Sequence, residues 1–188
     1  MEADEKVVYL TFDDGPVPGP TDFVLDQLSR FSISATFFCI GDNIRKYPDI
    51  FRRILAHGHS VGNHTVNHLN GWKTDTAQYL KNVTSFDAIA QEAGLPGAAT
   101  LFRPPYGCIS PRQVRMLHDH RIVMWDVLTR DYNQSLPREA CLRGTIESSR
   151  PGSIIVFHDS YKAQRNMEYA LPRMIEALGS KGYTFKSL

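Results

Sequence analysis

Short apolar runs typical of β-strands alternate along this chain with segments whose apolar residues recur at helical spacing. The strand-like runs cover residues 7–12, 35–40, 60–62, 101–103, 122–127, 153–157 and 184–185. This alternation predicts an α/β fold in which about seven parallel strands carry their helices on the outside. An open, doubly wound sheet and a closed, distorted (β/α) barrel both fit the order of elements.

The helices are predicted from apolar residues spaced three and four positions apart. The expected helical segments cover residues 24–31, 50–55, 79–90, 137–149 and 171–178, with a further helix opening at Ser110. Gly94 is a C-cap signal, and Ser110 before Pro111 is an N-cap signal. The last helix is expected to begin at Leu171 and Pro172. No linker or repeat interrupts the pattern, so residues 1–188 are expected to form a single domain.

Composition and charge limit the classes of function. The 188 residues carry a net charge of +1 with scattered Lys and Arg, which gives no sign of a nucleic-acid partner. No apolar run reaches the length of a transmembrane helix, and the charged first residues lack the features of a signal peptide. The protein therefore either stays inside the cell or has lost an export signal. Three widely spaced cysteines predict no disulfide framework, and a monomer is expected.

Chemically reactive side chains gather where the predicted strands end. Because the carboxyl ends of parallel strands share one edge of a sheet, residues far apart in sequence are expected to meet there. In chain order, these residues are Asp13, Asp14, His64, His68, Arg103, Asp126, Asp131, His158 and Asp159.

His64 and His68 are four positions apart, which places both imidazoles on one face of a helical turn. With a carboxylate, which Asp14 could supply, they would form a three-ligand, zinc-type site with an open position. The alternative is a chance spacing in a polar loop. Adjacent like charges push each other's pKa values apart, so Asp13 and Asp14 cannot easily share one role. If Asp14 binds the metal, Asp13 would remain free as a general base. The alternative for the Asp-Asp-Gly-Pro segment is an ordinary turn.

Three further side chains are candidates for roles in chemistry. His158 follows a strongly apolar strand and could protonate a leaving group, although a buried core histidine has the same pattern. Arg103, stiffened by two prolines, could fix a carboxylate or lie on the surface. Asp131 could orient a histidine, with Asp126 as its competitor. Four histidines are expected on the surface: His57, His59, His118 and His120.

Five of these segments, taken in order, resemble the NodB-like polysaccharide deacetylases of carbohydrate esterase family four. The segments are Thr11-Phe12-Asp13-Asp14-Gly15-Pro16, His64-Thr65-Val66-Asn67-His68, Arg103-Pro104-Pro105-Tyr106-Gly107, Trp125-Asp126 through Asp131, and Ile154 to His158. The resemblance implies a distorted (β/α) barrel with about seven strands. It also implies a divalent metal, zinc before cobalt or nickel, held by Asp14, His64 and His68.

The resemblance also implies a catalytic role for each matching position. Asp13 would be the base that activates water, and Arg103 would hold it. His158 would be the general acid, tuned by Asp131. The backbone N–H of Tyr106 would stabilise the oxyanion.

The substrate groove implied by the resemblance is lined by Tyr106, Trp125, Tyr132 and Val156. The sequence departs from the family pattern at Leu128, where the family has Asp, and at Tyr132, where it has Trp. Val156 replaces a common Leu and would offer the acetyl methyl group a smaller apolar contact. These differences bear on substrate preference more than on catalysis.

The expected activity is the metal-dependent removal of N-acetyl groups from N-acetylhexosamine units of a glycan, such as peptidoglycan or a chitin-like oligomer. Two alternatives on the same fold are an O-acetyl polysaccharide esterase and a catalytically silent sugar-binding module. A metal-dependent phosphoesterase fits less well, because it would need more carboxylates or more basic groups at this edge.

Overall fold

A computed structural model describes residues 6–188, and its strands pair in parallel in one sheet. The described strands are β1 (Val7–Asp13), β2 (Thr36–Cys39), β3 (Ser60–Asn63), β4 (Leu101–Phe102), β5 (Arg121–Ile122), β6 (Val127–Leu128), β7 (Ile154–His158) and β8 (Thr184–Lys186). Their order is β5-β4-β3-β2-β1-β7-β6, and β8 pairs with the start of β1. The charged residues 1–5, which bear on the question of a signal peptide, lie outside the described part.

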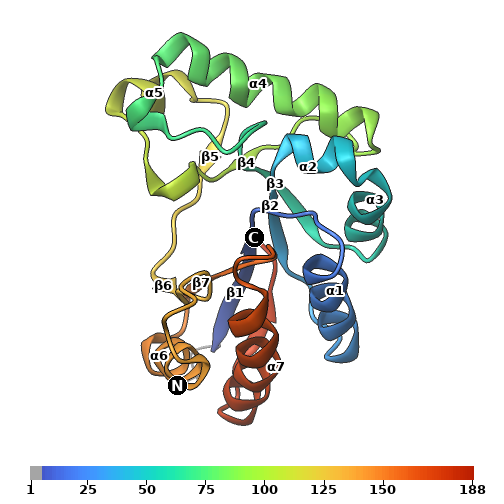
Figure 1. The fold of residues 1–188 in the computed structure, drawn as a ribbon, viewed down its shortest axis with the longest axis vertical. Coiled ribbons are helices and arrows are strands. Elements are labelled where there is room, and N and C mark those ends of the chain that lie inside the picture. Colours follow the sequence, from blue (N-terminus) through green and yellow to red (C-terminus); the bar gives the residue numbers. More distant parts are fainter. Residues whose placement is uncertain (1–5) are drawn as a thin grey trace, which may run out of the picture.

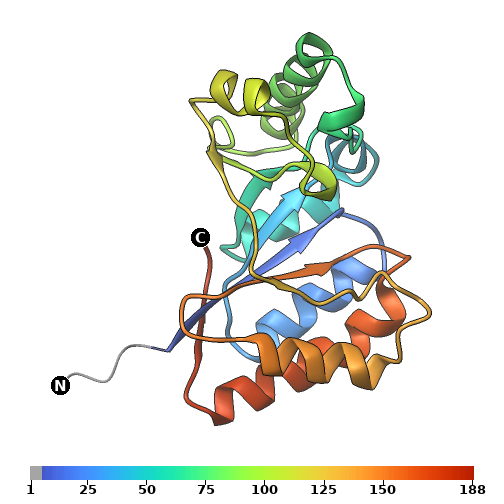
Figure 2. The ribbon, with the colours of Figure 1, turned by 90° about the vertical axis from the view of Figure 1, so that its left-hand side faces the viewer.

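The sheet curls into a distorted, incomplete barrel, which confirms the predicted architecture. β5 and β6 stand at the two ends of the strand order, and residues 123–126 cross between them along one side of the molecule (Figure 2). The single strand expected over residues 122–127 is therefore wrong. The backbone of Val123 still donates to Phe102 (2.8 Å), whereas that of Asp126 donates to Ile154 (3.3 Å). An extended segment that changes partners in this way has the same apolar pattern as one strand.

The helices cover the outside of the sheet (Figure 1). They are α1 (Pro20–Arg30), α2 (Gly41–Lys46), α3 (Pro48–Ala56), α4 (Thr76–Glu92), α5 (Pro111–Met116), α6 (Arg138–Ser148) and α7 (Gln164–Ser180), with short 3-10 turns at Gly71–Lys73 and Pro105–Gly107. Ser110 caps α5 as predicted, and its Oγ accepts from the Gln113 N–H (3.2 Å). The short α2 was not predicted.

The last helix begins at Gln164, well before the expected start at Leu171, so that Pro172 lies inside it. Met167 and Ala170 in the added turns are fully buried and extend the apolar face of α7. Packing of this face thus outweighs the cost of a proline within the helix.

Strand β1 separates its side chains by face, as the period of two requires. Leu10 and Phe12 of β1 pack into the main core, where the Phe12 ring stacks on that of Phe157 from β7 (6.2 Å between centroids). Thr11 and Asp13 alternate with them and point to the opposite, interior side of the curled sheet. The main core therefore lies between sheet and helices, and the polar side chains of β1 lie on the interior face.

The four histidines expected on the surface differ in their exposure. His57 and His118 are exposed as predicted, and His120 is partly exposed. The prediction for His59 is wrong, because its ring is buried against Phe37 (5.3 Å between centroids). The segment after α3 turns back onto the sheet there, which a local sequence pattern does not reveal. Burial lowers the pKa of His59 to about 4.

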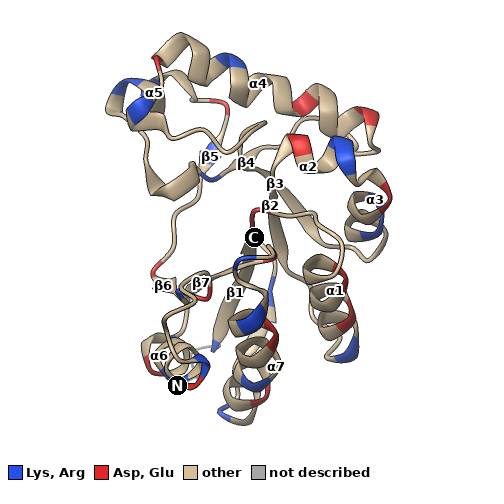
Figure 3. Cartoon of the chain, viewed as in Figure 1, with Lys and Arg blue, Asp and Glu red and all other residues tan. Residues whose placement is uncertain are grey.

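Among residues 6–188, no helix combines the length and apolarity that crossing a membrane demands. Figure 3 shows Lys and Arg interspersed with Asp and Glu on the outer helices.

Candidate active site

The residues singled out by the sequence line one cavity of about 440 Å³ at the carboxyl end of the strands. Its lining consists of Asp13, Asp14, His64, His68, Tyr106, Trp125, Leu128, Tyr132, Val156, His158 and Lys162. Two predicted site residues, Arg103 and Asp131, are buried behind this lining and contact the residues that form it. The convergence expected from parallel strand ends is thus present.

Strand register sets the relation between the candidate base and the candidate acid. Asp13 ends β1 and lies directly opposite His158, which ends β7. Two positions earlier, Thr11 lies opposite Val156. Residues at matching positions of paired strands project to the same face. Asp13, His158 and Val156 therefore face the same cavity.

Asp14, His64 and His68 form the one described cluster that could hold a metal ion, with candidate ligand atoms within 4.8 Å of one another. Asp14 Oδ1 lies 3.2 Å from His68 Nε2 and 3.7 Å from His64 Nε2. Within residues 6–188 this buried oxygen accepts no hydrogen bond of standard geometry. A buried carboxylate oxygen that faces two imidazole nitrogens without a donor fits a divalent cation between them.

Hydrogen bonds at the far side of each imidazole leave Nε2 available. His64 Nδ1 lies 2.7 Å from the carbonyl oxygen of Arg103, which can only accept, so Nδ1 carries the proton. His68 Nδ1 contacts the Tyr106 hydroxyl (3.0 Å). Such outer contacts fix the tautomer and orientation of metal-binding histidines.

The protonation states of the cluster also suit a metal. Burial opposes ionisation of Asp14, but the contact with His68 and the charge of His158 outweigh it and lower its pKa to about 2. Burial lowers the pKa of His64. An ionised carboxylate and a neutral imidazole are the forms that bind a cation.

The backbone between the two histidines differs from the expected helical turn. Residues 65–67 form a turn in which Thr65 adopts a φ of 65°, and His68 follows with a φ of 59°. The Asn63 side chain stabilises this turn by accepting from the Thr65 N–H (2.8 Å). The imidazole rings nevertheless converge, with centroids 5.0 Å apart.

Arg103 is fully buried and contacts Asp13 directly. Its Nη1 donates to Asp13 Oδ1 (2.7 Å) and to Thr11 Oγ1 (2.8 Å), and its Nε donates to the Val123 carbonyl (3.1 Å). The guanidinium also lies over the Phe38 ring, 4.1 Å from its centroid. Arg103 is therefore no surface residue, and it fixes one oxygen of the candidate base.

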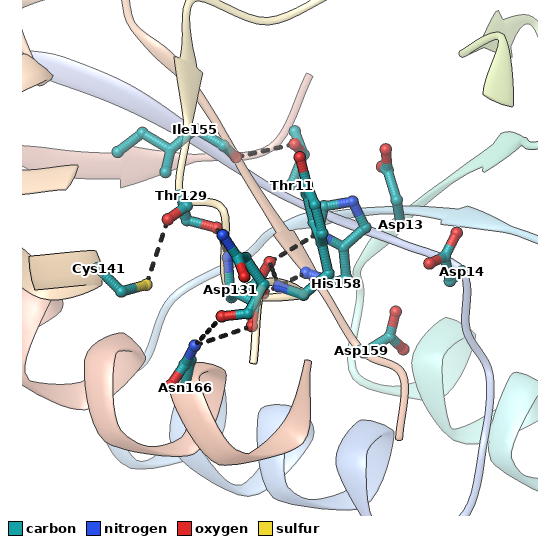
Figure 4. Close-up of polar contacts among 12 residues, drawn as sticks. Thr11, Asp13, Asp14, Thr129, Asp131, Cys141, Ile155, His158, Asp159 and Asn166 are labelled. Atoms are coloured by element: carbon teal, nitrogen blue, oxygen red, sulfur yellow. Dashed lines mark hydrogen bonds and ion pairs between the residues drawn. The ribbon is translucent and has the colours of Figure 1, made fainter. Parts of the chain in front are cut away.

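His158 and Asp131 form a second pair (Figure 4). His158 Nδ1 donates to Asp131 Oδ1 and the His158 backbone N–H donates to Oδ2, both at 2.7 Å. Burial alone would lower the pKa of His158, but the charge and hydrogen bond of Asp131 raise it to about 9. The competitor Asp126 instead accepts from Ser153 Oγ and the Ile154 N–H.

Unusual backbone geometry concentrates around this cavity. Among the described non-glycine residues, the left-handed region is occupied by Asp14, Ser32, Thr65, His68, Tyr106 and Arg130. Asp14, His68 and Tyr106 line the cavity. Thr65 follows the lining residue His64, and Arg130 precedes Asp131, which supports His158; only Ser32 lies elsewhere. Left-handed conformations are costly for residues with a side chain and often accompany functional sites.

The cavity walls are largely aromatic and apolar. Tyr106 is 62% exposed at the mouth, and the Tyr132 ring stands edge-on to His158, 5.0 Å between centroids. Leu128 and Tyr132, where the sequence departs from the family pattern, both line the cavity. Trp72 is 70% exposed and lies outside this lining.

Several residues of the site were not assigned a role from the sequence. Lys162 lines the cavity from the loop after β7. Asn166 supports the Asp131 segment by donating to the Asp131 carbonyl (3.2 Å), and Asp159 contacts the Asp14-Gly15 turn. The one sequence signal for Asp159 was its position at a strand end, directly after His158.

The fold and the site define a parallel α/β barrel that is open between two edge strands and carries an Asp-His-His cluster at its carboxyl end. Residues 1–125 match the family model described as polysaccharide deacetylase. The chain belongs to this family, and the predicted resemblance to a NodB-like domain is confirmed.

Individual relatives extend the comparison along nearly the whole chain. A peptidoglycan-N-acetylglucosamine deacetylase of Bacillus cereus is 35% identical over 96% of this chain, which spans 66% of that relative. A chitooligosaccharide deacetylase of Rhizobium leguminosarum bv. trifolii is 31% identical over 99% of this chain and 92% of its own length. A crystal structure of a peptidoglycan N-acetylglucosamine deacetylase bound to 4-naphthalen-1-yl-N-oxidanyl-benzamide has a TM-score of 0.92 at 33% identity, covering 98% of this chain and 87% of that one.

Proposed function

We propose that this protein is a metal-dependent hydrolase that removes acetyl groups from the nitrogen of N-acetylhexosamine units in a glycan. The observation that carries the proposal is the arrangement of one cavity. Asp14, His64 and His68 line this cavity together with Asp13, and His158 lies opposite Asp13 on the neighbouring strand. The relatives named as peptidoglycan and chitooligosaccharide deacetylases support the same chemistry.

Asp14, His64 and His68 would hold the metal, and the donor set of two imidazoles and one carboxylate favours zinc, with cobalt or nickel as alternatives. When bound, the ion supplies a Lewis acid that acidifies water and polarises the acetyl carbonyl group. Tyr106, whose hydroxyl contacts His68, would help to orient that ligand and would offer its backbone N–H to the developing oxyanion.

Asp13 is the proposed general base. Arg103 binds only Oδ1 in the described contacts, so the other carboxylate oxygen can accept a proton from the attacking water. Arg103 would thus keep the base correctly oriented.

His158 is the proposed general acid. Its Nδ1 is committed to Asp131, which leaves Nε2 to donate a proton to the departing amine nitrogen. The raised pKa keeps the imidazole protonated near neutral pH. The products would be acetate and a free amino sugar.

The proposed substrate groove is formed by Tyr106, Trp125, Tyr132 and Val156, which line the cavity around the acid and the base. Aromatic faces suit the apolar faces of sugar rings. Val156 lies two residues before His158 on the same strand face and would contact the acetyl methyl group.

Acetate release tests the proposal. N-acetylglucosamine oligomers, peptidoglycan and O-acetylated xylan are incubated with the protein, with added zinc or with a chelator, beside an Asp13→Asn variant. We expect chelator-sensitive release from N-acetyl substrates that is lost in the variant. Release from xylan alone would make the protein an O-acetyl esterase, and no release despite bound zinc would support a sugar-binding module.

A further inference from the structure

The backbone at Asp14 needs external support. Its φ of 81° lies in the left-handed region, which disfavours a residue with a Cβ atom. Asp14 directly follows β1, so this single conformation determines that its carboxylate turns towards the two histidines.

Side chains from two distant segments hold the peptide group that joins Asp14 to Gly15. Asn43 Nδ2 donates to the Asp14 carbonyl oxygen (2.7 Å). The N–H of Gly15 donates to Asp159 Oδ1 (3.0 Å), and the backbone N–H of Asp159 donates to the Asp13 carbonyl (3.1 Å). Rotation of this peptide plane would break the bonds at both of its ends.

The carboxyl group of Asp159 is itself held by Thr21. Thr21 Oγ1 donates to Asp159 Oδ2 (2.6 Å) and accepts from the Val17 N–H (2.8 Å). Both Thr21 and Asp159 are fully buried. A Cβ atom added to Gly15 would lie 1.9 Å from Asp159 Oδ2, so the close approach of this carboxyl group explains why a glycine follows Asp14.

Asp159 does not line the catalytic cavity, although it directly follows His158 in the chain. Figure 4 shows it beneath Asp14. Burial raises the pKa of Asp159 to about 8, but both hydrogen bonds are compatible with either charge state. In the neutral form the proton on Oδ2 can donate to Thr21 Oγ1, an arrangement that an asparagine at this position reproduces.

We propose that Asp159 and Thr21 are positioning residues, which together with Asn43 clamp the Asp14–Gly15 peptide and thereby fix the metal ligand Asp14. The inference rests on the proposed function, because it assigns a role to residues that act on a proposed ligand. Loss of outer contacts to metal ligands typically weakens metal affinity 10- to 100-fold.

The test uses paired variants at both positions. Thr21→Val removes the hydroxyl at nearly constant volume, whereas Thr21→Ser retains it. Asp159→Ala removes both carboxylate oxygens. Asp159→Asn retains an acceptor for the Gly15 N–H and a donor for Thr21 Oγ1, as in the neutral carboxyl group. Thr145→Val is the matched control, because Thr145 is equally buried and its hydroxyl bonds within α6 (2.8 Å to Cys141 O).

Zinc affinity of the metal-free proteins is measured by competition with a chromophoric chelator. We expect Thr21→Val and Asp159→Ala to weaken zinc binding at least about tenfold, and Thr21→Ser and Asp159→Asn to stay within about threefold of the unmodified protein. Thr145→Val should lower thermal stability without changing zinc affinity. If Asp159→Ala fails to fold, the Thr21 pair decides the question.

Amide exchange of Gly15, followed by NMR in the metal-free protein, is an independent measure of the clamp. We expect the Gly15 N–H to exchange faster in Thr21→Val than in Thr21→Ser. If the unmodified protein binds no zinc, the proposed function fails, while this exchange still tests the clamp. Unchanged zinc affinity and unchanged Gly15 exchange in Thr21→Val would overturn the inference, as would equal loss of zinc affinity in Thr145→Val.

Discussion

Replacing Asp131 with Asn should shift the pH range in which the protein is active, and not only lower its activity. The substitution keeps the shape of the side chain and an acceptor for the Nδ1 proton of His158, but it removes the negative charge. In the proposed mechanism, only the protonated imidazole can donate to the leaving nitrogen. Activity therefore falls as pH rises through the pKa of His158.

The size of the shift follows from the causes of that pKa. Burial lowers it, whereas the charge and hydrogen bond of Asp131, followed by the charges of Asp14 and Asp13, raise it to about 9. Without the Asp131 charge we expect a value of about 6.5 or lower. The protonated fraction at pH 8 then falls from about 0.9 to about 0.03, about 30-fold, whereas at pH 6 it changes less than about twofold. Bound metal would lower both pKa values, so the difference between the two proteins is the quantity to compare.

The assay is kcat/KM for acetate release between pH 5 and 10, with zinc saturating at each pH. Asp126→Asn is the matched control, because Asp126 bonds to Ser153 and Ile154 instead of His158. The pH at which activity falls on the alkaline side should be lower in Asp131→Asn and unchanged in the control. An alkaline limb at the same pH in both variants and the unmodified protein would refute His158 as the acid tuned by Asp131.

Three further substitutions or treatments test the rest of the site. Asp13→Asn should lower kcat about 10²- to 10⁴-fold while zinc affinity, measured by chelator competition, stays within a few-fold. Zinc at 100 times its Kd should stabilise the metal-free protein by about 2.7 kcal/mol, seen as a higher Tm, and His68→Ala should abolish this gain. Arg103→Met should cost about 3–5 kcal/mol in urea unfolding, because it leaves the buried Asp13 carboxylate unpaired. Adding Asp13→Asn to that variant should recover part of the lost free energy of unfolding. If the effects of the two substitutions on this free energy are simply additive, that would argue against the Arg103–Asp13 ion pair.

Sequence patterns predicted the parts of this fold that depend on local chemistry. The apolar run of β1 ends in two carboxylates, and Ser110 before Pro111 marks the start of α5. Parallel strand ends then explain why Asp13 and His158 meet, although 145 positions separate them in the chain. The contact between Arg103 and Asp13 was implied by the family resemblance, whereas the local pattern left a surface position open.

The features that sequence did not predict depend on contacts between distant segments. The extended segment 122–127 carries one apolar pattern but bonds to β4 at one end and to β7 at the other. His59 follows a glycine in a polar stretch, and only the return of the chain onto Phe37 buries it. Asp159 acts on Gly15, 144 positions away, and its place directly after His158 does not reveal this contact.

The same strand register governs both stability and the proposed chemistry. Phe12 and Phe157 lie opposite each other on the helix-covered face of β1 and β7, so their burial fixes how these strands align. With that alignment, Asp13 and His158 stand opposite each other one residue later, on the interior face. A slip of one residue in either strand would move the core ring of that strand to the interior and its terminal polar side chain into the core. The hydrophobic core thus selects the alignment that brings the proposed base and acid together, and no separate interaction between those two residues is required.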